Sequence, residues 1–470
     1  MSGAAGRRLA VSRAATLAAA AGLWVAPLPA GLTEQAWHLF AIFAAAILSV
    51  VAGALPILTA SVLAVALAVL TGTVSPADAY AGFANPTILL IVVAFLVARA
   101  VVKCGLGERL GYRAISLFGR STLGLSYSVF VVDAIIAPAF PSNTARSGVL
   151  FPLAVSVAEA AGAKPGVAGR RRLGQYLMFS GIASLTVSSA LWLTAMVANP
   201  LGAEIARGYG VEIGFGSWLI AASVPTLAAM ALLPLLLYRV IPPEVSATPH
   251  APAEARKALA ALGPLDRDQK VVGVTFFGTV ALWGAAATLG IDPTAVAFLG
   301  LATLLVTGVL TLDDIAKEGD VLATFLWFAA LFTLSDQLNR LGFMAFVGDR
   351  LAFRLGGLTP AVAGVLLVVV YVLLHYLFVS QTAHLLALFG VFLGVGVKLG
   401  VPAALLAFQL LFATNYFAAI TPQGSSANLL FAGSGYLSQG DLYRLGAIAT
   451  GFSLLLYLVV GTGWLMLVAR

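Results

Sequence analysis

The chain has 470 residues, of which 61% are hydrophobic and only 10% are charged. Soluble globular domains carry roughly 25% charged residues, so this composition argues against a soluble enzyme and against a disordered chain. One cysteine and four histidines are too few for an internal disulfide, a cysteine metal cluster or a histidine-rich metal site. The net charge of +7 indicates the basic cytoplasmic loops of a membrane protein rather than a nucleic-acid partner.

Apolar segments of the length that crosses a bilayer, about 20 residues, occur along the whole chain. Arginines precede the first segment as they do in a signal peptide, but the hydrophobic chain that follows favours a retained membrane helix. The fold class is therefore an all-α polytopic membrane protein. We predict about eleven spans, at 9–29, 36–52, 54–72, 85–103, 172–203, 215–240, 271–289, 293–311, 321–336, 402–435 and 445–468.

Most of the 26 Lys and Arg residues fall on one predicted side when the N-terminus is placed in the cytoplasm. The main basic segments on that side are 7–13, 103–120, 164–172 and 239–270. Because cytoplasmic loops are enriched in Lys and Arg, we expect a multi-pass protein of a bacterial inner membrane with a cytoplasmic N-terminus.

The two halves of the chain repeat the same order of features. Segments opened by 105–108 and 341–343 each precede a long apolar stretch, 121–161 or 359–399, that contains a short polar break. Leaving aside the first span, about five spans precede each comparable point, so the repeats have opposite orientations, which is typical of secondary transporters. The predicted divisions are a terminal helix in 1–35, a first repeat in 36–241, a cytoplasmic linker in 242–270 and a second repeat in 271–470.

Each polar break is predicted to form the tip of a re-entrant helical hairpin inside the membrane. Pro138 and Pro141 stand just before the first break, and proline cannot continue a helix from within. The second stretch has no proline at this point, and its turn is inferred from its polar tip of the same type. Non-helical backbone at this depth is tolerated only where it lines a cavity or is buried in protein.

The triplets at the two breaks are candidate ligands for an anion. A helix N-terminus follows each triplet, and its free N–H groups and positive dipole end favour negative charge. The alternative for a single triplet is an ordinary N-cap within a buried helix pair. Two triplets separated by 238 residues favour a site for a substrate with two carboxylates. The candidate residues are Ser142, Asn143, Thr144, Ser380, Gln381 and Thr382.

A basic side chain follows each triplet at the same offset, Arg146 in the first hairpin and His384 in the second. Charges inside a membrane are costly and indicate function. We hypothesise that Arg146, helped by His384, supplies positive charge where a sodium-coupled carrier would hold Na⁺. Such a carrier could return across the membrane only with an anion bound, so it would exchange one anion for another. The alternatives are that Arg146 pairs with Asp133 or extends to the cytoplasm, and that His384 is neutral and hydrogen-bonded. For Asp133, pairing with Arg146 is favoured over carrying a coupling proton.

The span after each hairpin also has a polar interruption. It falls at 186–189, followed by Asn199 and Pro200, in the first repeat, and at 421–428 in the second. Proline and glycine near these positions predict unwound segments, whose carbonyls and hydroxyls would complete each half of the site.

These features resemble the divalent anion/sodium symporter family. Within that family they are most similar to the branch of citrate/succinate antiporters, tartrate/succinate antiporters and plastid 2-oxoglutarate/malate translocators. The resemblance spans nearly the whole chain, and its most specific part is Ala137–Arg146, APAFPSNTAR. The other matching stretches are Ala36–His38, Gly105–Arg109, Leu193–Leu201, Ser380–His384 and Gly433–Tyr436.

The resemblance implies a homodimer in which each subunit has a scaffold domain and a mobile transport domain with elevator-type alternating access. It implies di- or tricarboxylate substrates such as succinate, malate, 2-oxoglutarate or citrate, no cofactor, and Na⁺ only if the protein is a symporter. The family's loop residues beside its signature triplets fall on Ser188-Ser189 and Thr421-Pro422. Gln381 stands where the family commonly has Asn, and loop 421–428 matches neither symporters nor exchangers. A sodium symporter and a carrier of another dianion, such as a sulfonated acid, therefore stay open.

A membrane-embedded enzyme is the main alternative from another class. The chain's acidic cluster lies in a short loop, 313–320, without histidine, and no phosphate-binding loop, HExxH or GxSxG motif is present. An ion channel gives no reason for two interrupted hairpins in inverted repeats. The sequence therefore predicts a secondary active carrier of small organic anions without enzymatic activity.

Overall fold

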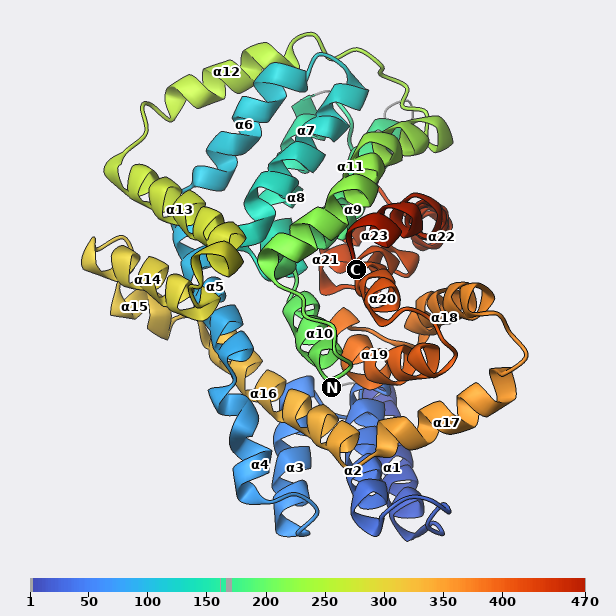
Figure 1. Ribbon diagram of the computed structural model, residues 1–470. Helices are drawn as coiled ribbons and strands as arrows, with labels where there is room; N and C mark the ends of the chain where they lie inside the picture. The colour runs from blue at the N-terminus through green and yellow to red at the C-terminus, as the bar shows by residue number, and fades with distance from the viewer. Residues whose placement is uncertain (1–2, 161, 166–170, 470) are drawn as a thin grey trace.

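The computed structural model describes residues 3–160, 162–165 and 171–469, and most of this part of the chain is helical (Figure 1). The first half forms α1 (Gly3–Val25), α2 (Glu34–Val51), α3 (Ile57–Leu70), α4 (Pro76–Tyr80), η1 (Ala81–Ala84), α5 (Pro86–Lys103), α6 (Leu106–Phe118), α7 (Thr122–Ile136), η2 (Ala137–Ala139), α8 (Asn143–Ala160), α9 (Arg171–Leu191), η3 (Leu193–Ala195), α10 (Ala198–Arg207), α11 (Phe215–Val240) and α12 (Ala251–Ala261). The second half forms α13 (Arg267–Leu289), α14 (Pro293–Val306), α15 (Leu312–Ala316), α16 (Gly319–Arg340), α17 (Phe343–Leu355), α18 (Pro360–Leu374), η4 (His375–Leu377), α19 (Gln381–Lys398), α20 (Ala403–Tyr416), η5 (Phe417–Ile420), α21 (Ser426–Ala432), α22 (Gln439–Leu456), η6 (Tyr457–Gly461) and α23 (Thr462–Val468).

Within the described residues, ten helices are long and apolar enough to cross a membrane, and three shorter apolar helices accompany them. The predicted spans 54–72 and 293–311 form the short helices α3 and α14, and the span 172–203 is divided between α9 and α10. The predicted basic segment 164–172 lies mostly outside the described residues. The all-helical polytopic fold that the composition predicts is confirmed.

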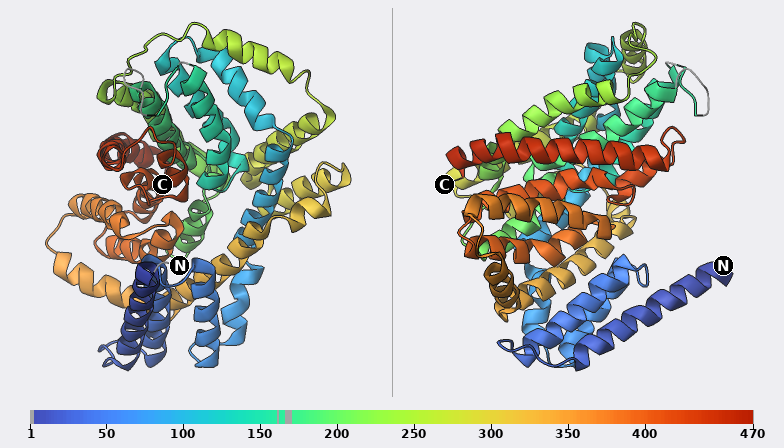
Figure 2. Two further views of the ribbon diagram at one scale, coloured as in Figure 1. Left: turned by 180° about the vertical axis from the view of Figure 1, so that it is seen from behind. Right: turned by 90° about the vertical axis from the view of Figure 1, so that its right-hand side faces the viewer.

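Hydrogen bonds between segments that are distant in the chain define two faces of the molecule, and α2, α3, α5 and α14 each run from one face to the other. The two ends of the chain lie on opposite sides in the right-hand view of Figure 2. Three bonds mark the face near the N-terminus: Ser12 Oγ to the carbonyl of Ala52 (2.5 Å), Lys103 Nζ to Asp314 (2.7 Å) and Arg267 to the carbonyl of Thr307 (2.8 Å). Three mark the other: Gln35 to the carbonyl of Thr73 (2.7 Å), Thr294 to that of Pro86 (3.0 Å) and Arg350 to that of Ala30 (3.4 Å).

The acidic loop between α14 and α16 has a structural role in this arrangement. Asp314 caps α15 together with the Thr311 hydroxyl and accepts a hydrogen bond from Lys103 of α5. The hydrogen bonds from Lys103 and Thr311 hold the pKa of the Asp314 carboxyl well below its ordinary value. Glu318 pairs with Arg99 of α5 at 3.0 Å, so two carboxylates of the loop tie α15 and α16 to α5.

Each repeat contains a helical arm, a hairpin and a broken helix. The arms α6 and α17 begin after Gly105 (φ 70°) and Gly342 (φ 82°), whose left-handed backbone conformation favours glycine at both positions. The hairpins are α7–α8 and α18–α19, and the broken helices are α9–α10 and α20–α21. Arg109 of α6 donates to the carbonyls of Leu262 and Gly263, which attaches the linker helix α12 to the first arm.

Both hairpins turn through a short 3₁₀ segment followed by extended backbone. In the first, η2 ends at Ala139, and the Ser142 hydroxyl accepts a hydrogen bond from the Ala145 N–H at the start of α8. In the second, which lacks the prolines, η4 ends at Leu377, and the Ser380 hydroxyl accepts from the Ala383 N–H. The same capping chemistry therefore closes both tips.

The break in the first broken helix lies later than the sequence predicts. Residues 186–189 are helical. The hydroxyls of Ser188 and Ser189 bond to the side chains of Asp133 and Asn143, so they do not compete for the backbone hydrogen bonds of the helix. The chain unwinds after Leu191, and the Asn199 side-chain amide donates to the freed carbonyls of Ser189 and Trp192. In the second repeat the unwound segment lies between Ile420 and Ser426, where it was predicted.

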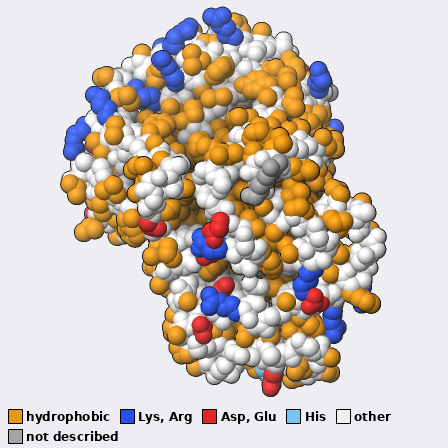
Figure 3. All heavy atoms as spheres, viewed as in Figure 1, with side chains coloured by type: hydrophobic (Ala, Val, Ile, Leu, Met, Phe, Trp, Pro, Cys, Tyr) orange, Lys and Arg blue, Asp and Glu red, His pale blue; other side chains and the backbone are white. Residues whose placement is uncertain are grey.

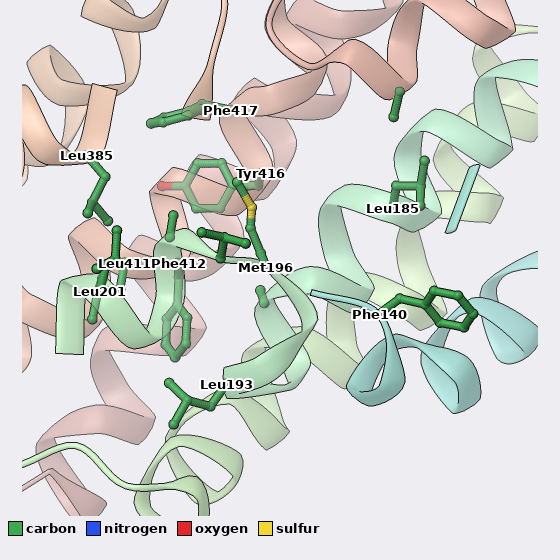
Figure 4. Close-up of a cluster of buried hydrophobic side chains, with 14 of the residues drawn as sticks. Phe140, Leu185, Leu193, Met196, Leu201, Leu385, Leu411, Phe412, Tyr416 and Phe417 are labelled. Atoms are coloured by element: carbon green, nitrogen blue, oxygen red, sulfur yellow. The ribbon is translucent and has the colours of Figure 1, made fainter. Parts of the chain in front are cut away.

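An apolar core joins the two broken helices (Figure 4). Leu201 of α10, Leu411 of α20 and Leu385 of α19 lie close together in this view. A Cβ on Gly202 would come within 2.1 Å of the Leu411 Cδ2 atom, so the helices approach closely at that point. This packing joins α10 of the first broken helix to α20 of the second.

Gly446 of α22 packs against the backbone that leads into the second unwound segment. A Cβ at this position would lie 2.0 Å from the carbonyl oxygen of Ala419, whereas a Cβ on Gly451 of the same helix meets nothing within 4 Å. We expect Gly446→Ala to lower the free energy of unfolding by about 1–3 kcal/mol, because backbone cannot yield as a side chain can. Gly451→Ala should leave it unchanged or raise it. Thermal unfolding of the purified variants in detergent checks this, and equal melting temperatures would contradict it.

Candidate functional site

The tips of the two hairpins meet in the interior of the protein. Asn143 opens α8 and Gln381 opens α19, and Asn143 Nδ2 donates a hydrogen bond to Gln381 Oε1 at 3.1 Å. Gln381 Nε2 donates to the carbonyl of Thr414 at 2.8 Å, which holds the Gln381 side chain against the end of α20. This is the facing arrangement that the repeated triplets predict.

A cavity of about 200 Å³ lies at these tips. Polar side chains of both hairpins form one part of its wall, and apolar side chains of α5 and α16 form another. It is therefore a site shared between the two repeats. The lining residues are Phe95, Pro141, Ser142, Asn143, Thr144, Met196, Val197, Thr324, Trp327, Val379, Ser380, Gln381, Thr382, Ser425 and Ser426.

All six triplet residues line this cavity, whereas the four candidate loop residues do not. Ser188 and Ser189 are buried behind Asn143, and Thr421 and Pro422 lie before the serines that do reach the cavity, Ser425 and Ser426. Ser426 Oγ lies 2.5 Å from Thr144 Oγ1, so the second unwound segment joins the first hairpin tip. The polar loop TPQGSSAN signalled this segment, but its composition alone does not say which of its hydroxyls faces inward.

Sequence reasoning missed the apolar wall. Phe95 of α5 and Trp327 of α16 are ordinary members of hydrophobic spans, and nothing in the sequence distinguishes them from membrane-facing residues. Their role follows from α5 and α16 packing together beside both hairpins. A pocket that combines apolar walls with a few convergent polar groups is typical of small-molecule binding sites.

Ser189 and Arg146 hold Asn143 in place from behind the cavity. Asn143 Oδ1 accepts hydrogen bonds from Ser189 Oγ at 2.6 Å and from Arg146 Nη2. Because Arg146 occupies the oxygen of this amide, the Asn143 Nδ2 group is directed at Gln381. Arg146 therefore acts on the tip through Asn143 and does not itself line the cavity.

Arg146 is fully buried and is paired with Asp133, as the favoured sequence interpretation of Asp133 predicts. Its Nη1 donates to Asp133 Oδ1 at 3.1 Å and to Ser188 Oγ at 2.7 Å, and Ser188 in turn donates to Asp133 Oδ2 at 2.5 Å. Both charged side chains are 0% exposed. Removing one partner of such a pair costs about 3–5 kcal/mol, because the other charge is left buried alone.

His384 lies in the corresponding position of the second hairpin and contacts a second histidine. Its Nδ1 is 3.4 Å from His375 Nδ1, and His375 Nε2 is 3.0 Å from the carbonyl oxygen of Gly424. The His375 ring stacks on Phe417 with 3.8 Å between ring centroids. The sequence analysis did not single out His375, which precedes the polar triplet by five residues.

The cavity suits an anion with two negatively charged ends. Helices α8 and α19 both begin at its wall, and the first N–H groups of a helix have no intrahelical acceptor. These groups and the partial positive charge of each helix end stabilise carboxylate or sulfonate oxygens. Hydroxyls of Thr144, Ser425 and Thr382 add neutral donors at the same wall.

A second polar cavity, of about 280 Å³, lies between α10 and α16, towards the face opposite the N-terminus. Arg207 and Arg340 line it, but each is paired with a carboxylate, Glu204 at 3.0 Å and Asp336 at 2.8 Å. Because each arginine is already paired with a carboxylate, we expect this cavity to attract an anion less strongly than the helix ends at the hairpin tips do.

The Asn143–Gln381 bond is expected to couple the two hairpins energetically. In a double-mutant cycle of Asn143→Ala and Gln381→Ala, the free energies of unfolding should be non-additive by about 1 kcal/mol, the typical worth of one such hydrogen bond. Unfolding in mixed detergent micelles measures the four proteins. Effects that add to within about 0.5 kcal/mol would contradict a contact between the tips.

A family model described as the sodium:sulfate symporter transmembrane region matches residues 7–470. YflS, a putative malate transporter of Bacillus subtilis (strain 168), is 40% identical over 451 residues, which are 96% of this chain and 94% of that protein. Dicarboxylate transporter 1, chloroplastic, of Arabidopsis thaliana is 37% identical over 454 residues, 96% of this chain and 82% of that protein. The crystal structure of the YdaH transporter of Alcanivorax borkumensis covers 98% of this chain and 97% of its own at 16% identity with a TM-score of 0.59, a likeness of fold alone. The chain therefore belongs to the sodium:sulfate symporter family, the divalent anion/sodium symporters.

Proposed function

We propose that the protein is a secondary active transporter of di- and tricarboxylate anions such as succinate, malate, 2-oxoglutarate and citrate. The observation that carries this proposal is the cavity enclosed by two hairpin tips, each ending in a helix N-terminus with hydroxyl and amide donors. Two such ends suit the two carboxylates of one substrate. The names of the malate and dicarboxylate transporters that the chain is similar to support this substrate class.

We propose exchange as the mode of transport. Arg146 and His384 are buried behind the two tips, where we propose that they take the place of the cations of a sodium-coupled carrier. These side chains stay with the protein, so substrate binding needs no Na⁺, and we propose that the carrier crosses the membrane only when it is loaded. The alternatives are sodium symport, which the description of the matching family favours, and transport of another dianion such as a sulfonated acid.

Alternating access is proposed to be of the elevator type. The hairpins and broken helices form one packed unit. Phe95 of α5 and Trp327 of α16, which lie outside this unit, close its cavity. Gly105 and Gly342, at the start of the arms, are natural hinge positions between this unit and the helices outside it. A homodimer, implied by the family resemblance, is part of the same proposal.

We place the N-terminus in the cytoplasm of a bacterial inner membrane. Basic side chains gather over α6 and α12 at the upper edge of Figure 3. Helix α6 follows Lys103, whose hydrogen bond to Asp314 lies on the face near the N-terminus. The basic residues of α6 and α12 include Arg109, Arg113, Arg256 and Lys257. An excess of Lys and Arg on one side supports its assignment to the cytoplasm.

Uptake of radiolabelled succinate into proteoliposomes tests the function. The vesicles are empty or preloaded with unlabelled succinate, each with and without an inward sodium gradient. Exchange predicts uptake only into preloaded vesicles and no effect of sodium. Sodium-dependent accumulation in empty vesicles would instead establish a symporter, and no uptake in any condition, repeated with citrate, 2-oxoglutarate and a sulfonated acid, would refute the substrate class.

Replacing Arg146 tests its role in exchange. Arg146→Ala should abolish exchange, but it also leaves Asp133 buried without its partner, so instability must be separated from loss of charge. The matched variant is Asp133→Asn combined with Arg146→Gln, which removes both charges and keeps polar side chains. If the double variant folds and still lacks exchange, the buried Arg146–Asp133 pair is required for transport and not only for folding. Full exchange by either protein would contradict that role.

A further inference from the structure

The charges behind the hairpin tips cancel when the cavity is empty. Asp133 neutralises Arg146 within one buried ion pair, so this pair brings no net positive charge to the site. In the second hairpin the imidazole of His384 stands at the position that corresponds to Arg146, and it contacts the imidazole of His375. A dianion that enters the cavity therefore meets helix ends and neutral donors but no unbalanced cation, unless one of these imidazoles takes up a proton.

The hydrogen bonds of the histidine pair define where its protons lie. A carbonyl oxygen only accepts, so His375 Nε2, 3.0 Å from the Gly424 carbonyl, carries a hydrogen. A neutral His375 then has a lone pair on Nδ1, which accepts from the Nδ1–H of His384. This arrangement leaves the lone pair of His384 on Nε2. That nitrogen is buried and has no hydrogen-bond partner among the described residues.

Among the residues that the structure describes, those around His384 offer an imidazolium no counter-charge. Its ring is enclosed by Tyr371, Phe378 and Phe417, with ring centroids 4.3, 4.8 and 4.7 Å away. A buried charge without a partner is costly, so the pair is neutral while the cavity is empty.

No other titratable group serves as that partner within the part of the chain that the structure describes. Besides His375, only the Tyr371 phenol has its ring against His384, and its hydroxyl is hydrogen-bonded to Thr414. Tyr416 of α20 packs against Tyr457 instead. Three carboxylates on the other elements packed against α19 have their own cations: Glu204 with Arg207, Asp336 with Arg340 and Asp349 with Lys398. The fourth, Asp320, is exposed at the first turn of α16, whereas Asp336 is in its last.

We propose that the His375–His384 pair is a proton-binding site and that a proton and the dianion bind together. The proton comes from solvent and forms one N–H bond on the lone pair of His384 Nε2. His384 lies one turn after Gln381, so a dianion at the α19 N-terminus supplies the counter-charge that the empty site lacks. Linkage is reciprocal, so protonation strengthens dianion binding by the same factor. This inference rests on the proposed function, and His375 acts as a positioning residue that fixes the tautomer of His384.

The test is to count the protons taken up when succinate binds to the purified, full-length protein. Succinate is titrated by calorimetry at about pH 7.5, where both its carboxylates are ionised, in two buffers with different ionisation enthalpies. We expect the uptake of more than zero and at most one proton per bound succinate. The affinity for succinate should rise by at most about tenfold for each unit by which the pH is lowered. Binding with no proton uptake and no pH dependence would overturn the proposal. Absence of binding by succinate, citrate and a sulfonated acid would overturn the proposed function itself.

Two variants assign the proton. His384→Gln keeps hydrogen-bonding capacity without a titratable group, and it should bind succinate more weakly and without proton uptake. Tyr371→Phe removes the other titratable group whose ring lies against His384 and should retain the uptake. Uptake that survives in His384→Gln would overturn the assignment to the histidine pair. Because the wild-type protein is measured first, the proposal is testable even if a variant does not fold.

Discussion

Backbone that leaves the helical path inside a membrane must find its hydrogen-bond partners within the protein, and the structure is organised around this constraint. Four chain segments unwind near one another, two at hairpin tips and two in broken helices. In each repeat a hydrogen bond joins the hairpin tip to the broken helix. The Val197 N–H donates to the Pro141 carbonyl in the first repeat, and His375 Nε2 donates to the Gly424 carbonyl in the second. The broken helices thus stabilise the tips, and the cavity is the space that remains between them.

Burial of charge is the second requirement at this position. Arg146 is kept within the hairpin by Asp133, and the two form a neutral unit that also holds Asn143 through its oxygen. In the second hairpin, uncharged imidazoles take the corresponding place. The side chains at the empty site therefore carry almost no net charge, so the free-energy cost of burying them is lower than for an unpaired charge. An anionic substrate changes that balance, and this is why proton uptake and substrate binding are connected in our account.

Much of this arrangement is predictable from sequence, because the same order of features occurs in both halves of the chain and indicates which segments have the same structure. The constant offset between Ser142 and Ser380 implies that both tips have the same construction in opposite orientation, and the hydrogen bond between Asn143 and Gln381 follows from it. The unwound segment of the first repeat was misplaced, since serine hydroxyls that bond to neighbouring side chains leave a helix intact. Phe95 and His375 were missed for another reason. Their roles depend on packing between helices that are distant in the chain, and a single sequence contains no local sign of such contacts.

The central claim is that one substrate bridges the two hairpin tips. The most direct measurement is a cryo-electron microscopy map of the protein with bound succinate. The account predicts density between Asn143 and Gln381, with one carboxylate at the start of α8 and the other at the start of α19. Density in the cavity lined by Arg207 and Arg340, with none at the tips, would contradict it.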